Sequence, residues 1–119
     1  MPPFAATPKR YAQGVRVEHA VIADLTSHGY HCTRAASSKG TADVIAIKTG
    51  QVLLVNVKRT TPPGPAERAD LFRVAWLLPG VGVPLVAIGP ASKLTYRILT
   101  GGGPRDWQPW HPDPIGDET

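Results

Sequence analysis

The chain has 119 residues, 42% of them hydrophobic and 18% charged, which is enough for one domain with a modest core but short for two. Its net charge of +4 is uneven, with +7 on residues 1–103 and −3 on residues 104–119, and a basic body suits a polyanion such as nucleic acid. The single Cys32 excludes an intrachain disulfide, and no long apolar run or signal-peptide core is present, so we expect a cytoplasmic protein outside membranes.

The first predicted element is a helix. Residues 1–10 are rich in Pro and Ala without periodicity, which is typical of a flexible arm. From Tyr11 to His28 apolar residues recur at helical spacing, and Gly29 then gives a stop signal. Glu18 flanks the apolar stripe of this helix, where a solvated surface carboxylate is the ordinary interpretation.

A first strand is predicted at residues 30–35, followed by a polar loop at residues 37–40. His28, His31 and Cys32 lie close together in sequence, but no second ligand pair follows at zinc-site spacing, so we predict no metal there. The loop reads Ser-Ser-Lys-Gly, and its hydroxyl and ammonium groups either contact phosphate oxygens or belong to a plain connection.

The strongest signal in the chain is a β-hairpin over residues 40–60. Two apolar, β-branched runs, residues 43–48 and 51–58, flank Thr49 and Gly50, and Gly accepts the positive φ that a two-residue turn needs. This turn sets the register of the two strands. The opposed pairs are Lys48 with Gln51, Ile45 with Leu54, and Asp43 with Asn56.

An acid, an amide and an amine meet at the open end of this hairpin. Lys58 lies two residues beyond Asn56 and shares its face, and Asp43 is opposed to that residue. Oxygen ligands of this kind can hold a hard cation such as Mg²⁺, and a neighbouring lysine can orient a nucleophilic water or offset phosphate charge. Phosphodiester hydrolysis needs both. The spacing leaves open the alternative that all three are polar strand ends facing solvent.

The remainder of the body predicts one helix and two strands. Residues 66–78 show helical spacing, and Trp76 within them is interpreted as a packing residue. The inward positions of this helix are predicted to be Leu71, Val74, Ala75 and Leu78. Residues 84–89 form a continuous apolar run that is typical of a buried strand, and residues 94–99 alternate as an edge strand does.

A glycine-rich boundary at residues 101–104 precedes the last segment. That segment contains too many prolines for regular structure to be expected, so Trp107 and Trp110 either dock on the body or are exposed. The predicted division is an arm at residues 1–10, one domain at residues 11–100 and a tail at residues 101–119.

The order helix, strand, hairpin, helix, strand, strand predicts an α/β fold with a mixed central sheet flanked by helices. The hairpin A-D-V-I-A-I-K-T-G-Q-V-L-L-V-N-V-K, with Glu18 and the serine loop before it, resembles the restriction-endonuclease-like PD-(D/E)XK nuclease superfamily. More narrowly, residues 11–99 resemble the archaeal-type (Hjc-like) Holliday junction resolvases, a branch that some viruses also carry.

This resemblance implies a structure-selective endonuclease that resolves four-way DNA junctions by metal-dependent phosphodiester hydrolysis. It implies a homodimer that makes paired symmetric nicks, and Mg²⁺ as cofactor with Mn²⁺ as a substitute. Neither an organic cofactor nor a membrane is implied. The predicted phosphate contacts are the cations near the site, namely Arg10, Arg16, Arg34, Lys39 and Arg59.

The resemblance also assigns site residues. Glu18 and Asp43 would be acidic metal ligands, and Lys58 would position water or stabilise the developing charge. Ser37 or Ser38 would occupy the family's active-site serine loop, and the sequence leaves the choice between them open.

One position departs from the family pattern, because Asn56 stands where the family has Glu. The amide keeps a carbonyl oxygen as third metal ligand but loses a negative charge, which weakens the binding of hard cations. Three explanations of this departure stay open. Either the site works at higher metal concentration, or the protein is a non-catalytic junction-binding module, or the residue was changed deliberately to trap a complex. A related repair or restriction-like nuclease, and a plain α/β interaction domain, stay open as further alternatives.

Overall fold

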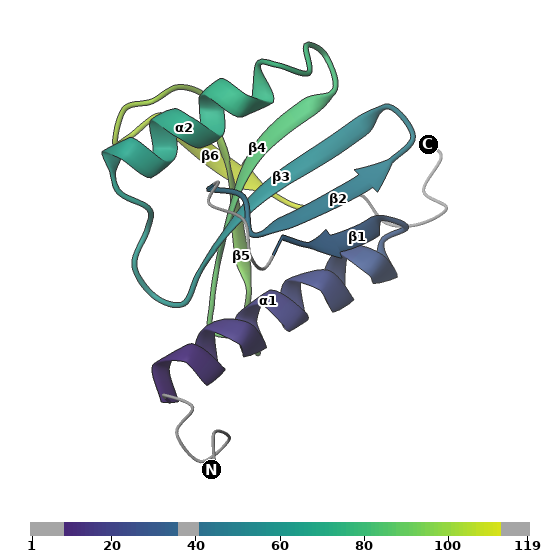
Figure 1. Cartoon of the computed structure of the whole chain (residues 1–119), viewed down its shortest axis with the longest axis vertical. Helices are drawn as coiled ribbons and strands as arrows, with labels where there is room; N and C mark the ends of the chain where they lie inside the picture. The colour runs from purple at the N-terminus through teal and green to yellow at the C-terminus, as the bar shows by residue number, and fades with distance from the viewer. Residues whose placement is uncertain (1–8, 36–40, 113–119) are drawn as a thin grey trace, which may run out of the picture.

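The structure is a computed structural model that describes residues 9–35 and 41–112. Within them, six strands form one sheet in the order β1-β2-β3-β4-β5-β6, with a helix on each face (Figure 1). The elements are α1 Lys9–Ser27, β1 His31–Arg34, β2 Val44–Lys48, β3 Gln51–Lys58, α2 Pro65–Ala75, β4 Gly82–Ile88, β5 Thr95–Leu99 and β6 Trp107–Trp110. The pair β3–β4 is parallel and every other pair is antiparallel, so the predicted mixed α/β fold is confirmed.

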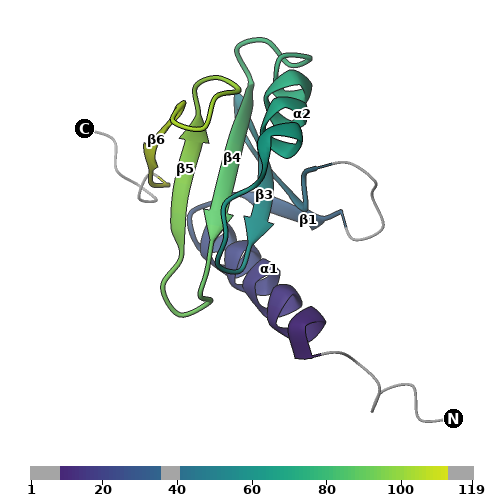
Figure 2. The same cartoon turned by 90° about the vertical axis from the view of Figure 1, so that its left-hand side faces the viewer.

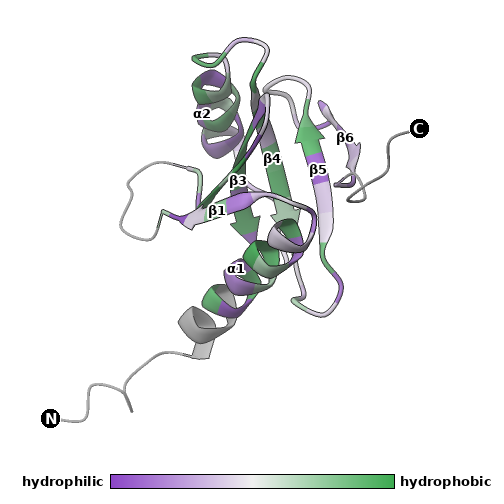
Figure 3. Ribbon diagram, turned by 90° about the vertical axis from the view of Figure 1, so that its right-hand side faces the viewer, coloured by the Kyte–Doolittle hydropathy of each residue, from purple (hydrophilic) through white to green (hydrophobic). Residues whose placement is uncertain are grey.

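The central strands are buried on both faces, because each alternates between two hydrophobic cores. Leu53 and Val55 of β3 pack against the α1 side with Val21 and Leu25 of that helix. Leu54 of the same strand packs on the other side, against α2. Figure 3 shows the resulting hydrophobic colouring along β3 and β4 and the more polar colouring of β6.

The hairpin register is as predicted. Lys48 is opposed to Gln51, and Ile45 to Leu54. Gly50 has a φ of 75° at the turn, which a side chain at this position would strain.

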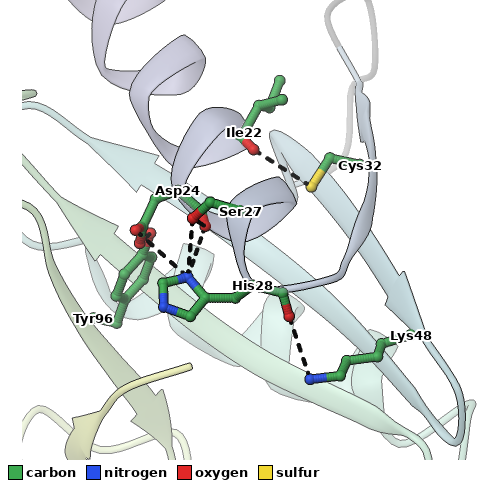
Figure 4. Close-up of polar contacts among 7 residues, drawn as sticks. All are labelled: Ile22, Asp24, Ser27, His28, Cys32, Lys48 and Tyr96. Atoms are coloured by element: carbon green, nitrogen blue, oxygen red, sulfur yellow. Dashed lines mark hydrogen bonds and ion pairs between the residues drawn. The ribbon is translucent and has the colours of Figure 1, made fainter. Parts of the chain in front are cut away.

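Polar contacts around the end of α1 involve His28 and Cys32, two of the three residues considered for zinc (Figure 4). Nδ1 of His28 lies 2.8 Å from the carbonyl oxygen of Asp24, and Cys32 donates its thiol to the carbonyl of Ile22 at 3.8 Å. Tyr96 of β5 donates its hydroxyl to the Asp24 carboxylate at 2.6 Å, and burial, followed by this contact, raises the pKa of Tyr96. These contacts set the position of α1 and thus of Glu18.

The expectation of an irregular last segment is wrong, because β6 pairs with β5 and replaces it as the edge strand (Figure 2). Pro109 lies within β6, and an edge strand tolerates a missing N–H because only one of its sides needs hydrogen bonds. Trp110 stacks edge-on against Tyr96, with ring centroids 5.5 Å apart, and Arg97 lies over the ring of Trp107. Both tryptophans therefore dock on the body, while the division of the chain into domains stays a prediction.

Two packing predictions for the second helix are also wrong. α2 ends at Ala75, so Trp76 is its C-cap residue and is 66% exposed. Leu78 lies beyond the helix and is exposed as well, whereas Leu71 and Ala75 are buried as predicted. Among the described residues, no helix is long and apolar enough to cross a membrane.

Candidate active site

The open end of the β2–β3 hairpin gathers three of the predicted site residues. Because β3 alternates between the two cores, Asn56 and Lys58 follow Leu54 on the face that α2 covers. Asp43 lies one residue before β2. If the register is continued beyond the pair of Val44 with Val55, Asp43 is opposed to Asn56. The register is confirmed as far as the pair of Val44 with Val55, whereas the pairing of Asp43 with Asn56 and the roles of the three residues stay predictions.

The Asp43 carboxylate takes the place of a backbone acceptor where the strands separate. Its Oδ2 accepts the backbone N–H of Val57 at 2.8 Å, and its own N–H donates to the carbonyl of Val55 at 2.7 Å. Partial burial raises the pKa of Asp43 despite the Val57 hydrogen bond, and the charge of Glu18 raises it further. A half-buried carboxylate next to another acid is stabilised by a bound cation.

Glu18 reaches toward this end of the sheet from α1. Its Oε1 pairs with Nε of Arg34 on β1 at 2.6 Å, and the two side chains are 20% and 30% exposed. Glu18 is therefore a paired, partly buried acid and not a solvated one. The phosphate contact predicted for Arg34 stays a prediction, and the structure adds an ion pair with Glu18.

Asn56 is 2% exposed, and only one of its two side-chain polar atoms has a hydrogen-bond partner among the described residues. Its Nδ2 donates to the carbonyl of Thr41 at 2.8 Å, whereas its Oδ1 has no hydrogen-bond partner among the described residues. Thr41 in turn donates its hydroxyl to Asp70 of α2 at 2.8 Å. A buried carbonyl oxygen without a donor is unfavourable unless something else binds it, and it is a suitable ligand for a hard cation.

The donor set fits Mg²⁺ in chemistry, since it consists of carboxylate and amide oxygens. Within residues 9–35 and 41–112, however, no three His, Cys, Asp or Glu side chains are grouped so that they could hold a metal ion. With Asn at position 56, the predicted ligand set contains two acids, Glu18 and Asp43.

Lys58 has a partner that the sequence analysis missed. Its Nζ donates to Oε2 of Glu67, on the first turn of α2, at 2.8 Å. Partial burial raises the pKa of Glu67, but hydrogen bonds from Lys58 and from the N–H of Gly64 outweigh it and hold that pKa below its usual value. The only sequence signal was Gly-Pro-Ala-Glu, a helix start with Glu at the third position, which indicates a cap and not a site.

The comparisons with known proteins agree with this geometry. The model of the archaeal Holliday junction resolvase (Hjc) family matches residues 9–63. Residues 9–63 are therefore similar to the archaeal Holliday junction resolvases. The solved structure of Archaeoglobus fulgidus Hjc, a Holliday junction resolvase from an archaeal hyperthermophile, is similar in fold with a TM-score of 0.56 and 21% identity over 70% of each chain. No curated protein matches the chain in sequence.

The match to the resolvase family spans α1 to the loop after β3. It includes Glu18, Asp43, Asn56 and Lys58, and also the loop with Ser37 and Ser38. Glu67 lies beyond it.

Two of the predicted phosphate contacts are brought together. Arg16 of α1 and Arg59, which follows β3, line one open cavity of about 360 Å³ together with Thr60 and Pro90. Arg10 lies in α1. Ser37, Ser38 and Lys39 lie outside the described residues.

Proposed function

We propose that the chain is a metal-dependent endonuclease that resolves four-way DNA junctions. The observation that carries this proposal is the open end of the hairpin, where a half-buried acid, a buried amide oxygen without a partner among the described residues, and a lysine lie inside the segment matched by the resolvase family. These are the groups that metal-assisted phosphodiester hydrolysis requires.

Mg²⁺, with Mn²⁺ as a substitute, is the proposed cofactor. Asp43 and Glu18 would hold it through carboxylate oxygens and Asn56 through its Oδ1, an oxygen that has no hydrogen-bond partner among the described residues. When bound, such a cation supplies Lewis-acid stabilisation of the phosphate and an activated water. Val57 orients the Asp43 carboxylate through its N–H, so this ligand is held in place before DNA arrives.

Lys58 is proposed to act on the scissile phosphate. Its ammonium lies on the same strand face as Asn56, and it would offset negative charge that develops on the phosphate or orient the attacking water. Glu67 restrains the side chain at 2.8 Å. Because 29% of the Lys58 side chain is exposed, it remains reachable by a substrate.

DNA binding is assigned to the basic body, and in particular to the cavity between Arg16 and Arg59. Two guanidinium groups that line one cavity next to the hairpin suit a phosphate of the DNA backbone. Such contacts carry little sequence information, in line with an enzyme that recognises DNA structure.

A homodimer is proposed because paired nicks need two sites. The surface that we assign to the partner copy is the apolar segment after α2, where Trp76, Leu77, Leu78 and Val81 are all exposed. Trp76→Ser with Leu77→Ser is expected to shift the protein from dimer to monomer in light scattering. An unchanged mass would place the interface elsewhere. We also propose a cytoplasmic location, on the strength of the single Cys32.

The proposal is tested with a panel of labelled DNA substrates, comprising a four-way junction, a flap and a linear duplex, each with Mg²⁺ and with EDTA. We expect paired symmetric nicks in the junction that depend on the metal. Equal cutting of the linear duplex would favour a repair or restriction-like nuclease. Binding that survives EDTA, without cleavage at any Mg²⁺ or Mn²⁺ concentration, would favour the junction-binding module, which the neutral Asn56 supports.

A further inference from the structure

The ion pair between Lys58 and Glu67 joins the hairpin to α2 at the candidate site. The two atoms, Nζ and Oε2, are 2.8 Å apart, and the side chains are 29% and 41% exposed. Glu67 is nine residues further along the chain and lies beyond the segment matched by the resolvase family. The carboxylate of the pair therefore comes from a part of the chain that the family match does not cover.

Position 56 explains why this partner matters. A Glu there would lie two residues before Lys58 on the same strand face and would offer it a negative charge. Asn56 has no charge to offer, and its amide is turned to the carbonyl of Thr41. The negative partner of Lys58 comes from α2 instead.

Glu67 also acts electrostatically on the acid of the site. Its charge raises the pKa of Asp43, as does the charge of Glu18, so both carboxylates lie within electrostatic reach of Asp43. With Glu67 included, this end of the sheet carries three carboxylates, whereas Glu18 and Asp43 alone make two.

Contacts on both oxygens hold the Glu67 carboxylate in place. While Oε2 accepts from Lys58, Oε1 accepts the N–H of Gly64 at 3.2 Å and closes the cap of α2. The next residue, Arg68, is 8% exposed and donates to the carbonyl of Pro63 at 3.0 Å and to that of Gly102 at 3.4 Å. The first turn of α2 is thus anchored on both sides of the carboxylate.

We propose that Glu67 is a further residue of the site, which supplies from α2 the negative charge that position 56 lacks and positions Lys58. This inference rests on the proposed function, because it assumes a bound divalent cation. Glu67 acts on that cation as a neighbouring charge and on Lys58 as a positioning residue. Removing one charge near a divalent ion weakens its binding by about tenfold in a partly solvated site.

The substitution Glu67→Gln separates this role from that of a helix cap. Glutamine at the third helical position closes the same cap, so the helix start is kept while the charge is lost. Asp106→Asn is the matched control, because it removes the same charge from the β5–β6 loop, where Asp106 accepts the N–H of Gly103 at 2.9 Å.

The experiment is a Mn²⁺ titration of the full chain by calorimetry, without DNA, on the parent, Glu67→Gln, Asp106→Asn, Asn56→Glu and the Asn56→Glu/Glu67→Gln double variant. We expect Glu67→Gln to bind about tenfold more weakly, Asp106→Asn to match the parent, and Asn56→Glu to restore parent affinity in the Glu67→Gln background. Melting curves report whether each variant is folded.

Each outcome decides a different point. Parent-like Mn²⁺ binding by Glu67→Gln overturns the role of Glu67 and leaves the nuclease proposal intact. An absence of Mn²⁺ binding by both the parent and Asn56→Glu overturns the metal-dependent function itself. If burial of a new charge prevents Asn56→Glu from folding, the comparison of Glu67→Gln with Asp106→Asn still decides, because weaker binding by both variants also overturns the proposal.

Discussion

The two ends of the β2–β3 hairpin are built from the same strands and differ in how their polar groups are satisfied. At the turn end, Gln51 accepts the hydroxyl of Tyr30, and Lys48 lies over the same ring, 4.9 Å from its centroid, while donating to the carbonyl of His28. At the open end, Asn56 keeps a buried oxygen without a partner among the described residues, and burial raises the pKa of Asp43.

This difference separates a structural polar group from a functional one. Groups that serve stability end with their hydrogen bonds made, whereas a site for a ligand keeps groups whose best partner is the ligand. The open end fits the second case. The comparison is tested by substitutions that affect one end and spare the other.

The largest expected effect is that of Asp43→Ala on cleavage. Loss of the carboxylate proposed to bind the metal should reduce junction cutting by about 10³-fold or more, because the proposed chemistry depends on it. Junction binding, measured by gel shift in EDTA, should stay within about twofold, since the basic body supplies that affinity. An equal loss of binding would count against the site assignment.

Lysines at the two ends give a matched pair. Lys58→Met is expected to slow cleavage at saturating metal by about 10²-fold, because a positioned cation is lost from the phosphate. Lys48→Met, at the turn end, should leave the cleavage rate unchanged and lower only the melting temperature. Single-turnover rates on the labelled junction measure both, and a full rate for Lys58→Met would remove this residue from the site.

The arginine cavity should affect binding more than chemistry. Arg16→Gln and Arg59→Gln are each expected to weaken junction binding and to reduce the slope of log affinity against log salt by about one, as the loss of a phosphate contact does. Titrations at several salt concentrations measure the slope. A slope equal to that of the parent would place the DNA elsewhere.

The smallest effect is expected at Asp70, which joins α2 to Thr41. Hydrogen bonding to Arg73, and then to Thr41, holds the pKa of Asp70 below its usual value of 3.8. A lowered folded-state pKa stabilises the fold above the unfolded value, and this contribution is lost as the pH falls through the folded value. Asp70→Asn should therefore melt below the parent at pH 6, with the difference disappearing below about pH 4. A difference independent of pH would show that the charge has no part in it.

Much of the fold followed from local pattern. The helical spacing before Gly29 and the two strand-like runs around Gly50 predicted α1 and the hairpin with its register, because these signals act over neighbouring residues. The missed elements depend on distant contacts. β6 contains Pro109, and only its place at the edge of the sheet makes that proline acceptable.

The site, like the fold, was predictable only where it depends on neighbouring residues. Asp43, Asn56 and Lys58 follow from the register, whereas Glu67 reaches Lys58 only because α2 packs across the strand ends. The ion pair of Glu18 with Arg34 was missed for the same reason, since it joins residues 16 positions apart. Exposure of Trp76 was missed because the helix ends earlier than its spacing indicates.

The most direct test of the central claim compares the parent chain with Asn56→Glu on a labelled four-way junction with Mg²⁺. The account predicts paired symmetric nicks by the parent, because the Asn56 amide oxygen, which has no partner within residues 9–35 and 41–112, and the charge of Glu67 make up for the missing carboxylate. Cleavage by the Glu variant alone would keep the architecture and show that Glu67 does not compensate. If both proteins bind the junction and neither cuts it, the catalytic assignment is contradicted.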